Sequence, residues 1–148
     1  MISDTHGLLR PEAVRLLRGA AHIIHGGDIG DPTILEALRE IAPVTAVRGN
    51  NDRDRWARAV PERAEVRIDA VAIYVLHNVA ELDFDPKGKC RVVVAGHSHK
   101  PMIEERGGVL YVNPGSAGPR RFSLPIALGE LRISGKSVRA RIRTLEVK

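Results

Sequence analysis

Residues 20–52, AAHIIHGGDIGDPTILEALREIAPVTAVRGNND, contain two apolar runs separated by an amphipathic stretch, and a polar loop follows each run. The first run, Ala20–Ile24, is short and apolar, which is typical of a buried strand. Asp31 and Pro32 predict the start of a helix, because Asp favours the N-cap and Pro fits the first turn. Val44–Val47 predicts a second strand. Strand, helix and strand in this order predict parallel strands joined by a right-handed crossover.

The chain before this stretch predicts one further helix and part of a strand. Pro11–Arg18 has a proline in its first turn and Gly19 directly after it, as expected of a short helix. Ile2 and Ser3 are typical of the end of a strand, but about five strand residues normally precede such a turn. We therefore expect a first strand that is truncated or unusually short.

The chain after this stretch predicts mainly β-structure. Alternating apolar residues and intervening turns indicate three hairpins, with a buried strand at Arg91–Ala95 between the first two. We therefore expect one α/β domain over residues 1–148, with two sheets. The hairpin strands are expected at Arg63–Ile68 and Val71–Leu76, at Met102–Glu104 and Val109–Val112, and at Ile126–Ile133 and Val138–Leu145.

The composition is that of an ordinary folded domain. With 148 residues, 43% of them hydrophobic and 28% charged, the chain has the usual size and character of one compact domain. An aromatic content of only 3% argues against base stacking on nucleic acid, and a net charge of +5 does not by itself indicate such a partner. The single cysteine, Cys90, excludes an internal disulfide, and no apolar run approaches the ~20 residues of a membrane span. We expect a cytoplasmic protein without a membrane segment.

Side chains that can bind metal ions follow the end of each expected strand. Glycines in these loops let the backbone turn sharply and keep the side chains clear of it. Carboxylate, amide and imidazole groups without a thiolate suit divalent manganese, iron, zinc or nickel. Seven such groups exceed the needs of one ion and match two ions that share a bridging carboxylate. They are Asp4, His6, Asp28, Asn50, His77, His97 and His99.

The order D-x-H, G-G-D, G-N-x-D, a lone His and G-H-x-H, which runs from Asp4 to His99, resembles the calcineurin-like metallophosphoesterases. The resemblance extends from Ile2 through Ser116 and is strongest to the small bacterial and archaeal phosphodiesterases. It implies a four-layer α/β/β/α sandwich with two mixed sheets. It also implies a phosphodiesterase in which a hydroxide activated by two metal ions attacks a small phosphoester. Manganese is the expected metal, with nickel, iron and zinc as alternatives.

The resemblance also implies a role for each ligand. Two divalent cations against two carboxylates leave an excess of positive charge, which attracts a phosphate. In this assignment Asp28 bridges the two ions, Asp4, His6 and His99 hold one of them, and Asn50, His77 and His97 hold the other.

Other polar residues have structural interpretations beside the functional ones. His22, in an apolar run, is expected to be structural. For His25, both a structural role and a role in orienting a metal ligand stay open. Cys90 is expected to pack in the fold rather than act as a nucleophile. Arg120 and Arg121 are expected to be solvated, with phosphate steering as the alternative.

The chain departs from the larger relatives at the position after the ligand asparagine. Those relatives have a histidine there that protonates the leaving oxygen, whereas this chain has Asn51, and an amide cannot act as an acid. The small relatives also lack that histidine. We therefore name Asp28, Asn51 and Asp52 as the catalytic candidates, with Asp52, a histidine or water as the source of the proton. Residues 80–89 are too few, and contain Pro86, for the helix that many relatives have there.

Two other functions compete with hydrolysis. The retromer subunit that shares this fold is a protein-binding scaffold that lacks a histidine of the G-H-x-H motif. Both His97 and His99 are present here, which favours the enzyme. A nucleic-acid-binding module would need interleaved aromatic residues or a dense basic run, and the sequence has neither. A small phosphoester is thus the expected partner, and homo-oligomerisation stays open.

Overall fold

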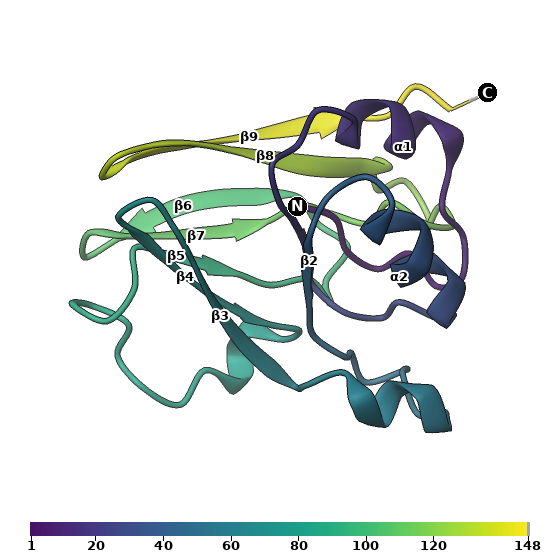
Figure 1. Cartoon of the computed structure of the whole chain (residues 1–148), viewed down its shortest axis with the longest axis horizontal. Coiled ribbons are helices and arrows are strands. Elements are labelled where there is room, and N and C mark those ends of the chain that lie inside the picture. The colour runs from purple at the N-terminus through teal and green to yellow at the C-terminus, as the bar shows by residue number, and fades with distance from the viewer. Residues whose placement is uncertain (148) are drawn as a thin grey trace.

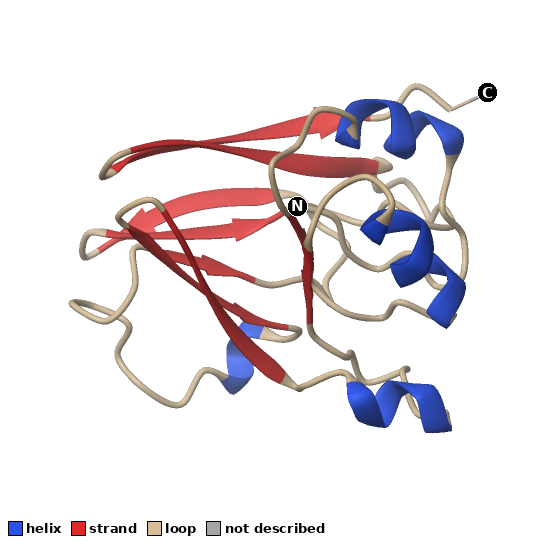
Figure 2. Cartoon of the chain, viewed as in Figure 1, coloured by secondary structure: helices blue, strands red, loops and turns tan. Residues whose placement is uncertain are grey.

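The computed structural model describes residues 1–147, which form two layers of β-structure with the α-helices on one side (Figures 1 and 2). One layer is a five-stranded mixed sheet, and the other contains a parallel pair and an antiparallel hairpin. The five strands, in spatial order, are β3 (Arg63–Ile68), β4 (Val71–Leu76), β5 (Val92–Val94), β7 (Val109–Asn113) and β6 (Met102–Arg106). The pair is β1 (Ile23–His25) with β2 (Val44–Ala46), and the hairpin is β8 (Ala127–Ser134) with β9 (Ser137–Thr144).

The N-terminal residues join the two parts of the second layer. Ile2 forms a parallel bridge to His25 of β1. Met1 exchanges two hydrogen bonds with Gly129 of β8, with N···O distances of 2.7 and 2.9 Å. The expected short first strand is therefore a single bridge, and the second sheet is interrupted where that strand would continue.

Both predicted helices are present. Helix α1 (Pro11–Leu17) ends one residue earlier than predicted, because Arg18 has extended backbone angles. Helix α2 (Pro32–Arg39) begins after Asp31, whose side chain accepts a hydrogen bond from the Thr33 N–H and caps the helix. The two helices cover the outer face of the second layer (Figure 2). Their apolar side chains, including Leu17, Leu35 and Leu38, pack with Ile2, Ile23 and Leu128.

The two β-layers enclose the second apolar core. Alternate residues of β4 point into it, as the period of a strand requires, and Val71, Ile73 and Val75 are all buried there. They pack with Ile24 and Val47 from the β1–β2 side. This packing fixes the distance between the layers and brings the carboxyl ends of their strands together.

The outer face of the five-stranded sheet corrects one expectation. The expected fourth layer of helix is absent from the described residues, and a loop over 79–90 lies there with a single 3₁₀ turn, Val79–Glu81. The loop covers an apolar cluster in which Phe84 packs edge-on against Tyr74, with ring centroids 4.9 Å apart. Pro86 and the short length of the segment explain why no α-helix forms. The second 3₁₀ helix is Arg55–Ala59. Neither α-helix within residues 1–147 is long and apolar enough to cross a bilayer.

Candidate metal centre

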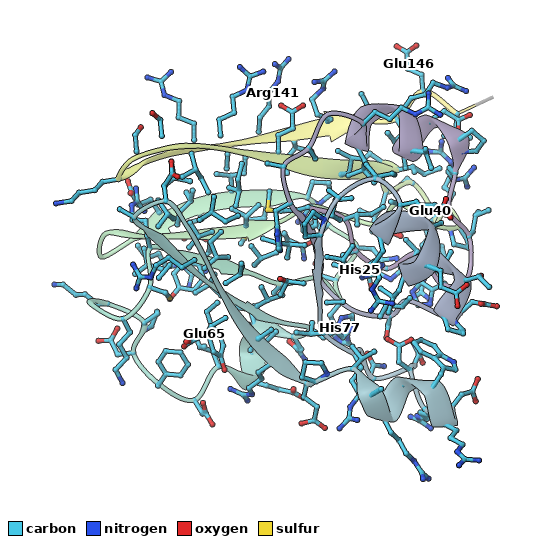
Figure 3. The ribbon with its side chains drawn as sticks, viewed as in Figure 1. His25, Glu40, Glu65, His77, Arg141 and Glu146 are labelled. Atoms are coloured by element: carbon cyan, nitrogen blue, oxygen red, sulfur yellow. The ribbon has the colours of Figure 1, made fainter. Side chains whose placement is uncertain are left out.

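The predicted ligands converge where the strands of the two layers end. Asp28 follows β1 and Asn50 follows β2, while His77 follows β4 directly. His77 and His25 project toward the same region from different layers (Figure 3), and His77 Nδ1 lies 2.7 Å from the Gly26 carbonyl. The loop after β5 supplies the last two histidines of the set. All of these groups come from separate segments of the chain that only the fold brings together.

One group of potential ligands consists of Asp4, His6 and His99. Asp4 Oδ1 lies 3.3 Å from His99 Nε2 and 3.8 Å from His6 Nε2. The two Nε2 atoms are 3.3 Å apart. One carboxylate oxygen and two imidazole nitrogens at this spacing can contact a single ion between them.

A second group consists of Asp4, Asp28 and His77. Asp28 Oδ2 lies 3.3 Å from His77 Nε2 and 3.7 Å from His6 Nε2, so it stands between a histidine of each group. Asn50 Oδ1 lies 3.2 Å from His97 Nδ1 at the exposed side of the cluster. The ring of His97 meets the ring of His77 edge-on, with centroids 5.2 Å apart.

Two buried atoms of the cluster point into it without a hydrogen-bond partner among the described residues, Asp4 Oδ1 and His77 Nε2. The other ends of both side chains are held. Asp4 Oδ2 accepts hydrogen bonds from the Ser3 hydroxyl at 2.6 Å and from the His97 N–H at 3.1 Å. His77 donates through Nδ1 to the Gly26 carbonyl, which leaves a lone pair on Nε2. Buried polar atoms are costly without a partner, and a divalent cation would satisfy both.

The carboxylates of the cluster are held in their charged form. Burial alone would raise the pKa of Asp28, but hydrogen bonds from His77 and Asn51 outweigh it and hold this pKa well below its ordinary value. The pKa of Asp4 is also lowered, because hydrogen bonds from His99 and a neighbouring hydroxyl outweigh burial. The pKa of His77 is raised, since its contact with Asp28 outweighs burial. The site is thus a concentration of negative charge that attracts cations.

The backbone of the cluster is strained at five of the predicted ligands. Positive φ angles are unfavourable for residues with a Cβ, and their clustering is typical of functional sites. The φ angles are 54° at Asp4, 46° at His6, 54° at Asp28, 71° at His97 and 63° at His99.

Glycines allow this close approach. A Cβ on Gly49 would collide with the Asp28 carboxylate, and a Cβ on Gly96 would collide with the Ser3 hydroxyl and lie 2.5 Å from Asp4 Oδ2. Both glycines belong to the motifs that identified the site in the sequence. Their absence of a side chain lets the loops close around the two carboxylates.

Asn51 and Asp52 lie beside the cluster with their polar atoms engaged. Asn51 donates from its backbone N–H to Asp28 Oδ1 at 2.9 Å and from its side-chain amide to Oδ2 at 3.0 Å. The buried Asp52 carboxylate accepts hydrogen bonds from the backbone N–H groups of Ile29, Gly30 and Gly49, each at 2.9–3.0 Å. Asp52 therefore ties the loop after β1 to the loop after β2, and its oxygens point at backbone donors.

His25 has a structural position beneath the cluster. Its Nδ1 accepts a hydrogen bond from the Gly27 N–H at 3.0 Å, so the proton lies on Nε2, which contacts the Thr5 hydroxyl at 3.0 Å. Thr5 in turn donates to the Ile29 carbonyl at 2.8 Å. This chain of bonds joins the segments that carry Asp4 and Asp28. His22 is also structural in its contacts and lies 2.7 Å from the Thr45 hydroxyl.

Sequence reasoning missed the residues that hold the metal-binding loops. Asn113, at the end of β7, donates to the Gly96 carbonyl at 2.9 Å and to the Ser98 hydroxyl at 3.0 Å. The Ser116 hydroxyl donates to the Asp4 carbonyl at 2.9 Å. The signal was the polar run Asn113-Pro114-Gly115-Ser116 directly after a buried strand, a position where ligands and their supports gather.

A polar pocket of about 420 Å³ opens beside the cluster. Its wall includes Asn50, His77 and His97 on one side and Arg48 with Glu62 on the other. Arg48 pairs with the exposed Glu62 carboxylate at 3.0 Å. The pocket therefore connects the predicted ligands to a rim of mixed charge, where a group attached to a phosphate could lie.

Comparisons with known proteins agree with this geometry. A family model described as the calcineurin-like phosphoesterase superfamily domain matches residues 1–135. A probable metallophosphoesterase of Methanothermobacter thermautotrophicus is 32% identical, over 96% of this chain and 89% of the relative. The crystal structure of an archaeal phosphodiesterase is similar with a TM-score of 0.77 and 25% identity, over 96% of this chain and 97% of the other. Vps29 of Chaetomium thermophilum has the same TM-score at 19% identity, over 97% and 93%, and shows the shared fold.

The position of Asp28 between the two groups predicts that it is needed for both ions. Asp28→Asn keeps the shape of the side chain but removes its negative charge, so Mn²⁺ affinity is expected to fall by more than about 100-fold. Calorimetric titration of the metal-free protein measures this. Asp31→Asn is the matched control, because Asp31 is an exposed N-cap and asparagine caps equally well. Equal metal binding by the two variants would remove Asp28 from the site.

Burial of His25 predicts a pH dependence of stability. Burial lowers the pKa of His25 from 6.5 to about 4, so between these values the unfolded chain binds a proton that the native chain does not. The free energy of unfolding is therefore expected to fall with pH, by about 2 kcal/mol from about pH 6.5 to about pH 5 from this group. The raised pKa of His77 acts in the opposite direction.

Urea unfolding of the metal-free protein at both pH values isolates the contribution of His25. His25→Asn is expected to lose this part of the pH dependence. His22→Asn, which alters a residue at the surface edge of the same segment, is expected to retain most of it. An unchanged pH dependence in His25→Asn would show that the buried imidazole does not control it.

Proposed function

The chain belongs to the calcineurin-like phosphoesterase superfamily, and from that membership we propose that it is a phosphodiesterase that uses two divalent metal ions. At a coarse level the homologues support a phosphoester hydrolase. The observation that carries the finer proposal is the convergence of seven ligands on a site with two buried, unpartnered ligand atoms, Asp4 Oδ1 and His77 Nε2.

The donor set suits two ions that share a carboxylate. Divalent ions held here would supply electrostatic stabilisation of the phosphoryl oxygens and a water molecule that ionises near neutral pH. We propose manganese, with nickel, iron and zinc as alternatives, because the ligands are oxygen and imidazole without thiolate. In the proposed assignment Asp28 bridges, Asp4, His6 and His99 form one set, and Asn50, His77 and His97 form the other.

The chain positions these ligands before any substrate arrives. Ser3 and the His97 N–H hold Asp4 Oδ2, while Asn51 holds both oxygens of Asp28. Fixed ligands reduce the reorganisation that a charged transition state would otherwise require. We propose positioning roles for Asn51 and Asp52, since the polar atoms of both side chains are engaged with Asp28 or with backbone donors.

These engagements leave the leaving oxygen without an acid from either residue. The Asn51 amide cannot act as an acid, and the Asp52 oxygens accept three backbone hydrogen bonds that favour the ionised form. We therefore propose that water, or an exposed histidine such as His97, protonates the leaving group. The departure of the leaving group then depends on its own stability as an anion.

The pocket beside Asn50, His77 and His97 is the proposed seat of the second substituent of the ester. Arg48 and Glu62 at its rim offer both a hydrogen-bond donor and an acceptor. A monoester would leave this pocket empty, so its presence supports a diester with a polar substituent. The substrate class proposed is a small phosphodiester.

The alternative is a non-catalytic protein-binding scaffold. The likeness to Vps29 supports this alternative at the level of the fold, because its identity is only 19%. The complete ligand set favours hydrolysis. The two functions differ in one measurable property, the turnover of a phosphoester by the metal-loaded protein.

Hydrolysis of a series of phosphodiesters graded by leaving-group pKa tests the proposal. With no acid at Asn51, the rate is expected to fall steeply as the leaving-group pKa rises, so aryl diesters react faster than alkyl ones. Asn51→His introduces an acid and is expected to flatten this dependence. Asn78→His is the matched control, because Asn78 lines the same pocket but lies on the loop after β4.

Two outcomes would contradict the account. A flat dependence in the unmodified protein would mean that another group already donates the proton. No hydrolysis of any ester by protein loaded with Mn²⁺ would contradict the enzyme and favour the scaffold.

A further inference from the structure

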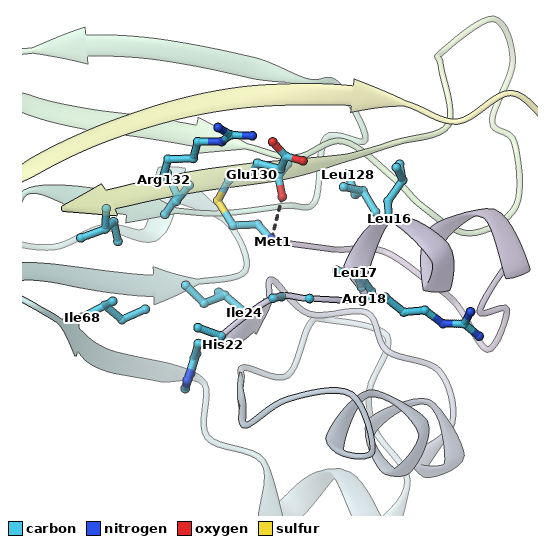
Figure 4. A pocket seen from close by; sticks show the side chains of 16 residues that line it. Met1, Leu16, Leu17, Arg18, His22, Ile24, Ile68, Leu128, Glu130 and Arg132 are labelled. Atoms are coloured by element: carbon cyan, nitrogen blue, oxygen red, sulfur yellow. Dashed lines mark hydrogen bonds between the residues drawn. The ribbon is translucent and has the colours of Figure 1, made fainter.

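A second cavity, of about 380 Å³, lies at the opposite end of β1 from the metal-binding cluster. Figure 4 shows it between β8 and the segment that leads into β1, with Met1 at its inner end. Its walls are apolar on both faces. Leu16 and Leu17 of α1 lie on one face, and Ile68 and Ile133 line the cavity from the strands.

The side of β8 that borders the cavity is an unpaired strand edge. Gly129 directs both its N–H and its carbonyl to Met1, so its pairing with Ile142 of β9 is a non-hydrogen-bonded one. Pairs alternate along an antiparallel ladder, and the β8–β9 register is continuous. Leu131 and Ile133 therefore also direct their backbone groups away from β9 and toward the cavity.

The side of β1 that borders the cavity is unpaired in the same way. Ile23 and His25 use their backbone groups on the β2 side, while the Ile24 carbonyl accepts from the Ile2 N–H at 2.9 Å. The N–H of Ile24 points to the same side as its carbonyl. It faces the cavity beyond Met1.

Met1 itself has the backbone position of a residue inside a strand. Its amino group is buried and donates to the Gly129 carbonyl at 2.7 Å, which is the bond that a peptide N–H makes in an antiparallel ladder. Burial lowers the pKa of this amino group to about 5. A peptide N–H at this position would make the same hydrogen bond without the cost of burying an ionisable amine.

We infer that the cavity is the seat of one further β-strand, formed by residues joined to the amino end of Met1, which pairs with β1 on one side and β8 on the other. The residue before Met1 accepts from the Ile24 N–H, and the residue before that pairs with Leu131. Both faces of the strand are buried, so its side chains are apolar throughout. The seated strand makes the second layer a continuous sheet and holds Ile2–Asp4 in line with the metal-binding cluster.

Variants with short N-terminal extensions test this inference. The extension Met-Lys-Val-Ile-Val, placed before Met1, is expected to raise Tm by several degrees and to protect the amides of Ile24 and Leu131 from hydrogen exchange. Met-Lys-Gly-Ser-Gly has the same length but no apolar side chains and is expected to change neither quantity. Met-Lys-Val-Pro-Val is expected to lose most of the gain, because its proline removes the N–H that pairs with Leu131.

Several results would overturn the inference. Equal Tm and equal exchange for the Val-Ile-Val and Gly-Ser extensions would show that the cavity does not seat a strand. Protection by a free acetylated Lys-Val-Ile-Val peptide, without protection by the attached extension, would assign the cavity to a separate chain. Dimerisation of the extended variant in size-exclusion chromatography would assign it to a second copy. None of these measurements depends on metal binding or on hydrolysis.

Discussion

The geometry of the site depends on how the Asp4 carboxylate is held. One oxygen accepts hydrogen bonds from the Ser3 hydroxyl and the His97 N–H, and the other points without a partner at His99 and His77. Asp4 is completely buried, so this free oxygen cannot be satisfied by bulk water. The left-handed backbone at Asp4, the absence of a side chain at Gly96 and the support from Ser116 all serve this one position. A buried anion with an open coordination position is a stable arrangement only with a cation beside it.

Much of the fold could be predicted from the sequence because its signals are local. Pro11, Pro32 and Asp31 mark helix starts, and the apolar runs that end in Gly-Gly-Asp or Gly-Asn-Asn-Asp mark strands followed by sharp turns. These patterns identified both α-helices and the strands β1–β9 to within a few residues. The ligand set followed from the same local pattern, since each ligand directly follows a strand. Its assignment to two ions rests on the resemblance and stays a prediction.

Long-range arrangements were not predictable in this way. The expected fourth layer came from the family resemblance, whereas Pro86 and the shortness of the segment after His77 opposed a helix there. The support that Asn113 gives to Gly96 and Ser98 joins residues about one strand apart in space but far apart in sequence. Asp52 looked like a proton donor by its position near the ligands. Only the fold shows that its oxygens face three backbone N–H groups.

The central claim is that this chain binds two metal ions at one cluster, and metal stoichiometry tests it most directly. Metal-free protein is loaded with Mn²⁺, freed of excess ion by gel filtration and examined by elemental analysis. The account predicts about two ions per chain, because the seven ligands form two sets that share a carboxylate. One ion or none in correctly folded protein would contradict it.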